Sequence, residues 1–420
     1  MTPTATRVWS VFILAYVSLY VFGVHRPPDS FISEQPWIVW KLMALPWSFG
    51  GISDAIQWVA TSQAPTLVRP ARAVIWLAMS KAFACIPHGY YIVNGVTLVA
   101  AAWVTWLLLV RLDVRPPRAL LGVLLVGVSL STLYPLVFFG YGQPLLAALV
   151  GLWWWFRGAT LGPLCLWSIA LFSHETYAAV LVVPLLHGWC VGPRERRAVL
   201  PLAMIVVYGL VRHWQGAVPL WPSISQNLVE YPDAAFEYPV RVGFTLITAG
   251  LPIETLRLLP WAPAYTRLRD MMAEPAMLAS LAVVVAPVLV MGWLAIRYGR
   301  GGRVAFALAW LGAAMVPLML PAGTPESVHF LGALAPMAIL WSEAFASRRY
   351  VVLAVCLTLR GGMHMTARLM SINRDLPAMS RAVQEIHRLA ASSGERIGIL
   401  FAPAQIGFHV YGMLPTMPAL

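Results

Sequence analysis

The sequence is poor in charged side chains, and lysine is nearly absent from it. Charged residues make up 11% of the 420 positions, and Lys41 and Lys81 are the only lysines. Hydrophobic residues make up 60%. A chain with so little charge cannot cover a water-soluble surface of ordinary polarity. The composition therefore argues against a soluble domain and indicates a multi-spanning membrane protein.

Cysteine is also scarce, and the cysteines are scattered. Cys85, Cys165, Cys190 and Cys356 lie singly within apolar runs. They lack the paired spacing of a metal site or a disulfide framework, so core packing is their expected role. No Walker, dinucleotide-binding, zinc or nucleophile-elbow motif occurs either. The motifs thus demand no cofactor or metal, although they leave room for a divalent metal.

Arginine carries almost all of the net charge of +12. In a soluble protein this balance would suggest a nucleic-acid partner. Here the arginines lie between apolar segments, where membrane topology and anionic lipid explain them better. We therefore expect membrane lipid, and no nucleic acid, among the partners. The excess of arginine over lysine, with abundant alanine and valine, is compatible with a bacterial inner membrane.

Apolar runs fill most of the first 360 residues. Because a span needs roughly 20 residues, we predict an all-α polytopic transmembrane bundle of about 10–13 spans. The clearest runs lie near residues 8–24, 90–110, 119–139, 144–156, 161–172, 177–190, 200–211, 277–296, 304–320, 330–345 and 351–359. A partial or re-entrant helix is expected at 73–86, and interfacial amphipathic helices at 37–47 and 52–59.

The short connections predict the orientation, because cytoplasmic loops carry an excess of arginine and lysine. With a cytoplasmic N-terminus, five inner connections all contain arginine, namely 111–118, 157–160, 192–198, 297–303 and 347–349. The opposite short connections contain none, namely 140–143, 173–176 and 321–329. This pattern puts the loop 212–276 and the C-terminal tail on the extracytoplasmic side.

The expected organisation is one transmembrane domain over residues 1–360 followed by a tail at 361–420. The domain has two outer loops, at 25–72 and 212–276. The tail is patterned as an amphipathic helix and a short apolar strand, which together suit a small extracytoplasmic element.

With this orientation, several ionisable residues are predicted to lie on the extracytoplasmic face. They are Asp29, His174, Glu175, Arg212, His213, Glu326 and His329. A carboxylate such as Glu175, between two apolar segments with almost no loop, is costly unless it faces a cavity or a partner. This convergence makes a functional site on that face the favoured interpretation.

The segment from Arg69 to Leu112 carries a resemblance. Arg69-Pro70, an apolar amphipathic stretch, Gly89-Tyr90, Asn94 and a long span resemble the multi-spanning glycosyltransferases of the GT-C superfamily. The pattern is most similar to the protein mannosyltransferase branch and its tetratricopeptide-linked relatives. Further similarities follow in the same order over the range from Val8 to Arg349. They are Leu133-Tyr134-Pro135 to Gln143, Ser173-His174-Glu175-Thr176, Trp310 to Pro317, and Pro325-Glu326-Ser327-Val328-His329.

This resemblance implies an all-helical enzyme that takes a sugar from a polyprenyl-phosphate donor and transfers it to a glycan, lipid or protein acceptor outside the cytoplasm. An acid early in the first outer loop acts as base in the family, and Asp29 occupies that position. Cationic residues stabilise the departing phosphate, a task that also suits arginine physically. The residues expected to bind substrate or phosphate are Arg69, Arg72, His174, Glu175, Arg212, Glu326 and His329.

The chain departs from the family pattern at three motifs. It has Asp29-Ser30 in place of two adjacent acids, His174-Glu175 in place of Lys-Glu, and Glu326-Ser327-Val328 in place of Glu-Arg-Tyr. His174 can replace a lysine only when it is protonated. No tetratricopeptide array follows the membrane domain, so acceptor recognition is expected from the outer loops and the tail.

Each expected site residue also has a purely structural interpretation. Asp29 is equally typical of a solvated loop carboxylate or a helix cap, and Glu34 and Asp54 are its rivals as base. Arg69 also suits a headgroup anchor. Glu326 and His329 would lie about one helical turn apart in a helix, where they could pair with each other.

Two other functional classes stay open. A transporter or flippase for a lipid-linked glycan would carry charged residues at mid-membrane depth along a pathway. A surface-polysaccharide polymerase or ligase would put the chemistry in the loop 212–276. The cationic residues of that loop are His213, Arg241, Arg257, Arg267 and Arg269.

Overall fold

The described part of the chain is entirely helical in its regular structure. The computed structural model describes residues 3–23, 35–62, 69–84, 86–127, 140–193, 195–214, 289–319, 332–346 and Val352. No strand occurs within these ranges. The predicted all-α class is therefore confirmed for this part of the chain. The predicted tail elements and the loop 215–276 lie outside it.

The helices follow the predicted segments closely. Their bounds are α1 (Pro3–Ser18), α2 (Gln35–Ala44), α3 (Phe49–Ser62), α4 (Pro70–Phe83), α5 (Pro87–Arg111), α6 (Pro116–Gly127), α8 (Gly142–Trp155), α9 (Leu161–Leu171), α10 (Ala178–Cys190), α11 (Leu200–Trp214), α16 (Gly301–Met319) and α17 (Leu334–Ala344). Short turns are η1 (Leu19–Gly23), η2 (Glu175–Tyr177) and η3 (Arg196–Val199). Pro70, Pro87 and Pro116 stand at the first helical position, where a missing N–H costs nothing.

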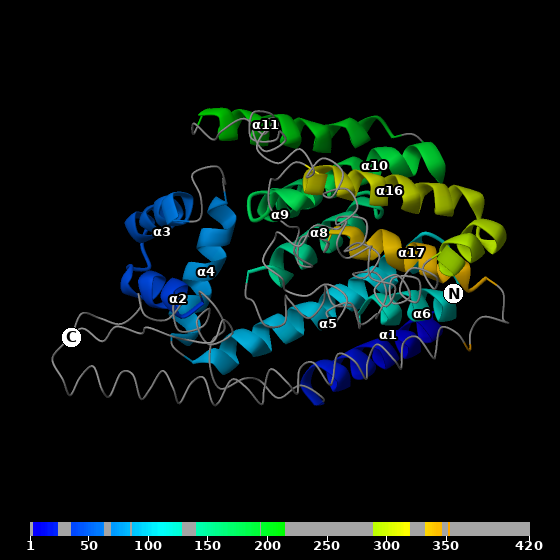
Figure 1. The fold of residues 1–420 in the computed structure, drawn as a ribbon, viewed down its shortest axis with the longest axis horizontal. Helices are drawn as coiled ribbons and strands as arrows, with labels where there is room; N and C mark the ends of the chain where they lie inside the picture. Colours follow the sequence, from blue (N-terminus) through cyan, green and yellow to red (C-terminus); the bar gives the residue numbers. More distant parts are fainter. Residues whose placement is uncertain are drawn as a thin grey trace, which may run out of the picture.

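Most of these helices run side by side as a bundle (Figure 1). The closest packing joins α8 to α9 and α5, α6 to α17, and α10 to α16. At one end of the bundle, α2, α3 and α4 form a separate group in which α4 lies across the direction of the bundle helices (Figure 1). The partial or re-entrant helix predicted at 73–86 corresponds to α4, which has 14 residues and lies at one end of the bundle.

The core is filled by large aromatic and aliphatic side chains. Trp106, Trp167 and Phe306 are fully buried in the main cluster of the bundle. A smaller cluster joins α2, α3 and α4 around Trp76 and Leu77. Burial of such side chains contributes roughly 2–3 kcal/mol each relative to exposure in water. Two separate apolar clusters therefore hold the bundle and its capping group.

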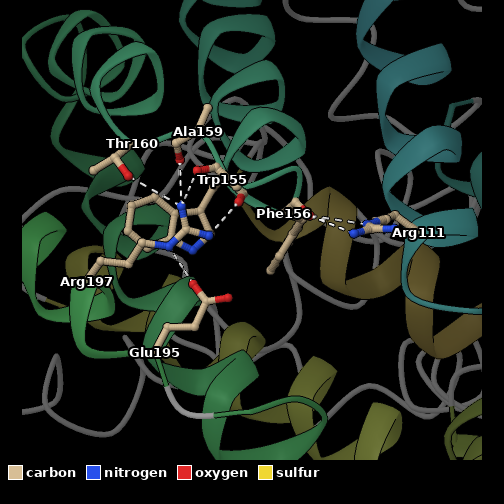
Figure 2. Close-up of polar contacts among 8 residues, drawn as sticks. Arg111, Trp155, Phe156, Ala159, Thr160, Glu195 and Arg197 are labelled. Atoms are coloured by element: carbon tan, nitrogen blue, oxygen red, sulfur yellow. Dashed lines mark hydrogen bonds and ion pairs between the residues drawn. The ribbon is translucent and has the colours of Figure 1, made fainter.

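The arginine-bearing connections lie together at the other end of the bundle. Arg197 donates to the carbonyls of Trp155 and Ala159 at 3.1 and 3.0 Å and pairs with Glu195 at 2.6 Å. Arg111 donates through Nε and Nη2 to the carbonyl of Phe156 at 3.2 and 3.0 Å. Figure 2 shows these contacts converging on the turn between α8 and α9. The connections 111–118, 157–160 and 192–198 therefore share one end.

A buried ion pair joins a fourth connection to the same end. Arg303 Nε lies 2.7 Å from a carboxylate oxygen of Glu343, and both side chains are buried. Arg303 Nη1 also donates to the carbonyls of Leu112 and Asp113 at 3.1 and 2.7 Å. The other oxygen of Glu343 accepts the backbone N–H of Arg300 at 2.8 Å. The predicted grouping of arginine-bearing connections thus holds for the four that the structure describes in full or nearly so.

Two of the described helical segments are long and apolar enough to cross a membrane. They are His88–Arg111 and Arg196–Trp214. The first is largely covered by neighbouring helices, as a core helix of a soluble protein would also be. Only 17% of the most apolar stretch of the second is buried. Other predicted spans correspond to shorter apolar helices, among them Pro116–Gly127 and Leu161–Leu171. Because the run 351–359 lies outside the described residues apart from Val352, the count of about 10–13 spans stays a prediction.

We expect Gly122→Ala to destabilise the fold through the α6–α17 contact. A Cβ atom on Gly122 would overlap Ser342 Oγ and the carbonyl oxygen of Ala338. The helices must move apart to admit it, which typically costs about 1–3 kcal/mol. The matched control is Gly312→Ala in α16, where a Cβ meets no atom within 4 Å.

Thermal unfolding of the detergent-purified protein measures both variants. Gly312→Ala should unfold at the wild-type temperature or slightly higher, because alanine is the better helix former. An unchanged unfolding temperature for Gly122→Ala would contradict the close α6–α17 packing.

Candidate functional site

The end of the bundle beside α4 holds a cluster of buried polar side chains from three segments. The start of α4 brings Arg69 and Arg72, the turn before α8 brings Tyr141, and η2 with its preceding residue brings His174 and Glu175. We call these five residues the α4-end cluster. Arg69, Arg72 and His174 are each less than 9% exposed.

A backbone hydrogen bond joins two of these three segments. Arg69 is the residue before the first turn of α4, where Pro70 fixes the helix start. The N–H of Ala71, which has no partner within α4, donates to the carbonyl of Phe172 at the end of α9 at 3.2 Å. One unsatisfied donor of one helix thereby meets one unsatisfied acceptor of another. The start of α4 is tied directly to the residues that precede His174.

Arg69 and Glu175 form a two-point ion pair across 106 positions of sequence. Arg69 Nη2 lies 2.7 Å from Glu175 Oε1, and Nε lies 3.1 Å from Oε2. This fork geometry is the strongest form of the arginine–carboxylate contact. The Arg69 side chain is 8% exposed, whereas that of Glu175 is 21% exposed. The pair therefore sits at a boundary, with its carboxylate the more accessible partner.

Electrostatics keep both partners charged. Burial alone would raise the pKa of Glu175, but the attraction of His174 and Arg69 and the hydrogen bonds from Arg69 hold that pKa well below its ordinary value of 4.5. Burial alone would lower the pKa of Arg69, but Glu175 beside it raises that pKa above its ordinary range. The cluster thus carries a fixed ion pair at neutral pH.

His174 connects this pair to η2. Its Nε2 lies 3.3 Å from Arg69 Nη2, and its Nδ1 lies 2.9 Å from Thr176 Oγ1. A guanidinium can only donate, so the Arg69 contact needs Nε2 as an acceptor, whereas the backbone N–H of Thr176, 3.4 Å away, needs Nδ1 as an acceptor. A neutral ring has one accepting nitrogen, so His174 can satisfy one of these two contacts at a time. A protonated His174, the state that the resemblance expects, would donate from both nitrogens and accept neither.

Arg72 lies against two aromatic rings. Its guanidinium carbon is 4.2 Å from the ring centroid of Trp76 and 4.6 Å from that of Tyr141. Its Nη2 donates to the Tyr141 hydroxyl at 3.0 Å. Cation–π contacts of this kind are worth more when the cation is desolvated. Arg72 is thereby stabilised in a buried position one helical turn from Arg69.

The turn 140–143 is braced on both sides. Gly140 has a φ of +89°, and its backbone lies so close to Trp76 that a Cβ there would overlap the indole. Its N–H donates to the side-chain oxygen of Gln143 at 3.2 Å, and the amide nitrogen of Gln143 donates to Asn94 in α5 at 3.2 Å. Glycine is needed here because other residues are strained at positive φ. This turn sets the position of Tyr141.

Arg212 lies at the edge of the cluster, beside Tyr208. The two residues lie one turn apart on α11, which places them on one face. Tyr208 packs against Phe172 with ring centroids 5.4 Å apart, and it interacts electrostatically with both Glu175 and Arg69. Arg212 itself is half-buried. Of the predicted binding residues, Arg69, Arg72, His174 and Glu175 thus lie together, with Arg212 at their edge.

Three predicted site residues lie outside the described part of the chain. They are the expected base Asp29 and the expected binding residues Glu326 and His329. Gly332, which follows the segment of Glu326 and His329, lies beside the backbone of Thr176. The first described residue after that segment therefore lies next to η2. The roles of the three residues stay predictions.

The aromatic residues in and around the cluster were not among the residues predicted from the sequence. Trp76, Tyr141 and Tyr177 lie around Arg72 and His174, and the Tyr177 hydroxyl donates to the Tyr141 carbonyl at 3.1 Å. The available signal was the short arginine-free connection 140–143, which contains Tyr141 and was predicted to lie on the same face as Glu175. Within the described residues, no group of three histidine, cysteine or acidic side chains is arranged to hold a metal ion.

The cluster has the chemistry of an anion site. It offers the buried guanidinium groups of Arg69 and Arg72, buried His174 and the Tyr141 hydroxyl, beside the partly exposed Glu175 carboxylate that pairs with Arg69. Such donors bind phosphate or carboxylate groups more strongly away from bulk water.

No protein-family model matches the sequence, and no curated protein matches it either.

We expect Glu175→Gln to destabilise the protein and to flatten its response to acid. A carboxylate whose pKa is lowered on folding contributes stability that is present above its unfolded pKa, near 4.5, and is lost as pH falls below that value. Removing one partner of a buried ion pair costs about 3–5 kcal/mol, and glutamine keeps the hydrogen-bonding shape, so a loss near the lower end is expected.

Unfolding temperatures of wild type and variant between neutral and acidic pH measure this effect. The control is Glu195→Gln, whose carboxylate is 44% exposed and pairs with Arg197 at the arginine-bearing end. That exposed pair should contribute at most about 1 kcal/mol. Parallel acid profiles for wild type and Glu175→Gln would contradict a stabilising charge at Glu175.

Proposed function

We propose that this protein is a polytopic membrane glycosyltransferase. In this proposal it takes a sugar from a polyprenyl-phosphate donor and transfers it to a glycan, lipid or protein acceptor outside the cytoplasm. Asp29 acts as the base, and the α4-end cluster receives the donor phosphate. The N-terminus and the arginine-bearing end face the cytoplasm of a bacterial cell. The GT-C resemblance contributes the reaction class, and the residues of the cluster contribute the chemistry.

The exposed face of α11 supports the membrane setting. Val206, Val207 and Leu210 are each more than half exposed, and Trp214 at the helix end is 84% exposed. An apolar face of this size is unfavourable in water and ordinary in lipid. The tryptophan at the end of the helix suits the headgroup region. The arginine-bearing connections lie together at the end of the bundle opposite α4. Because cytoplasmic loops carry an excess of arginine, this grouping supports a cytoplasmic position for that end.

The observation that carries the enzymatic proposal is the buried Arg69–Glu175 pair with Arg72 one turn away. A buried charge costs free energy unless it is paired, and ionisable residues within membrane segments commonly mark functional sites. Two guanidinium groups at one end of an apolar bundle suit a lipid-linked phosphate, which carries one negative charge in the sugar donor and gains a second as the polyprenyl phosphate leaves. The pairing also explains why the Glu175 carboxylate is tolerated between two apolar segments.

The chemistry of transfer follows from these assignments. The acceptor hydroxyl oxygen attacks the anomeric carbon of the sugar, and Asp29 removes the hydroxyl proton as the new bond forms. The bond between the anomeric carbon and the phosphate oxygen breaks, and the phosphate leaves with the electron pair. Arg69 and Arg72 stabilise the charge that develops on this leaving phosphate. The products are the glycosylated acceptor and the polyprenyl phosphate.

The placement of charge favours this proposal over a transporter. In the described helices of the bundle, charged side chains lie close to the helix ends, as with Arg303, Glu343 and Arg111. The buried polar residues farther inside α5 are the neutral Asn94, Thr97 and Thr105. A flippase pathway would instead need charged groups at mid-membrane depth. A polymerase or ligase acting through the loop 212–276 stays the second candidate, because that loop lies largely outside the described residues.

The chemical test is the profile of lipid-linked intermediates and surface glycans in a deletion strain. Loss of this enzyme should remove one sugar from a surface glycan or glycoprotein and accumulate the matching polyprenyl-linked precursor. Mass spectrometry detects both changes. Unchanged glycans and precursors in the deletion strain would argue against the proposed reaction.

We expect Asp29→Asn to abolish transfer without affecting expression or folding, because asparagine cannot accept the acceptor proton. The comparison variant is Asp54→Asn in α3, whose exposed carboxylate is the rival for the role of base and should be dispensable for transfer. Complementation of the deletion strain by each variant, with thermal unfolding of the purified proteins, separates activity from folding. Full complementation by Asp29→Asn would mean that the base lies elsewhere.

A further inference from the structure

Four arginines gather at the starts of two helices at the arginine-bearing end of the bundle. Arg115 immediately precedes α6, and Arg118 lies in its first turn. Arg300 immediately precedes α16, and Arg303 lies in its first turn. We call these four residues the α6–α16 arginine cluster.

Contacts with the end of α17 bring the two helix starts together. The Arg303 guanidinium pairs with Glu343 and donates to two backbone carbonyls just before α6. The backbone N–H of Arg300 donates to Glu343 at 2.8 Å. Arg118 Nη2 donates to the carbonyl of Ala346, three residues after Glu343, at 2.8 Å. The cluster is therefore fixed by the fold at one place.

The positive charge of the cluster exceeds the negative charge that answers it. Burial lowers the pKa of Arg118, which belongs to the connection 111–118, and the charges of Arg115, Arg303 and Arg300 lower it as well, whereas Glu343 raises it. Among the residues that the structure describes, no carboxylate forms an ion pair with Arg115, Arg118 or Arg300. Like charges held together repel one another, so a bound anion would be favourable here.

Arg115 and Arg300 are the accessible members of the cluster, because both side chains are exposed. The first turns of α6 and α16 contain no acidic residue. The N–H groups and the dipole at a helix start favour an anion, and here they add to the charge of the arginines. Gly301 leaves the start of α16 open, since a Cβ atom there would meet no atom within 4 Å.

An exposed apolar stripe leads to this cluster. Leu289, Trp293 and Ile296 lie on the helical segment Leu289–Tyr298, each more than half exposed. Their spacing of four and three residues puts them on one helix face. The stripe ends four residues before Arg300. A free phosphate makes no use of apolar side chains, whereas a phospholipid carries acyl chains next to its phosphate. An apolar stripe with arginine at its end therefore suits an anionic lipid.

We propose that the α6–α16 arginine cluster binds the phosphate of an anionic phospholipid of the phosphatidylglycerol class, whose acyl chains lie along Leu289, Trp293 and Ile296. This lipid supplies the negative charge that the cluster calls for and stabilises the packing of α6 and α16 against α17. The inference rests on the membrane setting of the proposed function and is independent of the transfer reaction. With the arginine-bearing end in the cytoplasm, the lipid belongs to the inner leaflet.

The test is the double variant Arg115→Gln/Arg300→Gln of the full-length protein. Native mass spectrometry in detergent measures its affinity for dioleoyl phosphatidylglycerol and for dioleoyl phosphatidylcholine. Wild type should bind phosphatidylglycerol in preference. The double variant should bind it about tenfold more weakly or worse, because each basic residue beside an anionic headgroup contributes to binding. Both side chains are exposed, so the unfolding temperature without added lipid should match wild type.

Arg157→Gln/Arg196→Gln is the matched control. It removes the same charge from two exposed side chains at the same end, which are not among the charges that act on Arg118. Its affinity for phosphatidylglycerol should change by less than about twofold, because salt screens exposed charges that do not contact the ligand. An equal loss in both double variants would overturn the site, since net charge alone would then govern binding.

Inorganic phosphate separates a lipid site from a site for a free anion. Added at the same concentration as the lipid, it should displace little phosphatidylglycerol from the wild-type protein. Displacement as effective as that by a second phospholipid would overturn the lipid assignment. Wild-type affinity in Arg115→Gln/Arg300→Gln would overturn the site and leave the proposed function standing. Unchanged glycans in the deletion strain would overturn the proposed function alone.

Discussion

The candidate site depends on one constraint, which is that Arg69 is buried and cannot give up its charge. An arginine stays protonated under any physiological condition, so a buried guanidinium requires an anion and hydrogen-bond acceptors around it. Glu175 supplies both through two contacts at 2.7 and 3.1 Å. This requirement brings the start of α4 against η2, and the backbone hydrogen bond from Ala71 to Phe172 joins α4 to the residues just before η2. Arg72 reaches Tyr141 only because α4 is held there.

The second buried ion pair, Arg303–Glu343, differs from Arg69–Glu175 because backbone groups also bind both of its side chains. Arg303 is bound by two backbone carbonyls as well as by Glu343, and Glu343 also accepts a backbone N–H. Its carboxylate is 2% exposed, against 21% for Glu175. Arg69, in contrast, is held by the side chains of Glu175 and His174.

The sequence allowed the helices and the charged members of the site to be predicted, but it did not reveal their pairing. Apolar runs with proline at the helix starts locate the helices, and the energetic cost of Glu175 between two such runs marks it as unusual. The pairing of Glu175 with Arg69 spans 106 positions, beyond any local pattern. Tyr141 and Trp76 gave no separate signal, because 14 tyrosines and 19 tryptophans are spread along the chain. Their role depends on the positive φ of Gly140, which only the folded turn defines.

Helix lengths bear on where the cluster would lie in a bilayer. Helices α8, α9 and α10 have 14, 11 and 13 residues. At about 1.5 Å per residue they are roughly 17–21 Å long, against about 30 Å for the hydrocarbon core. These three helices are therefore shorter than the hydrocarbon core, so the bilayer would thin around them or flanking side chains would extend to its surface. Thinning at this end of the bundle would keep the charged residues of the α4-end cluster near the membrane surface.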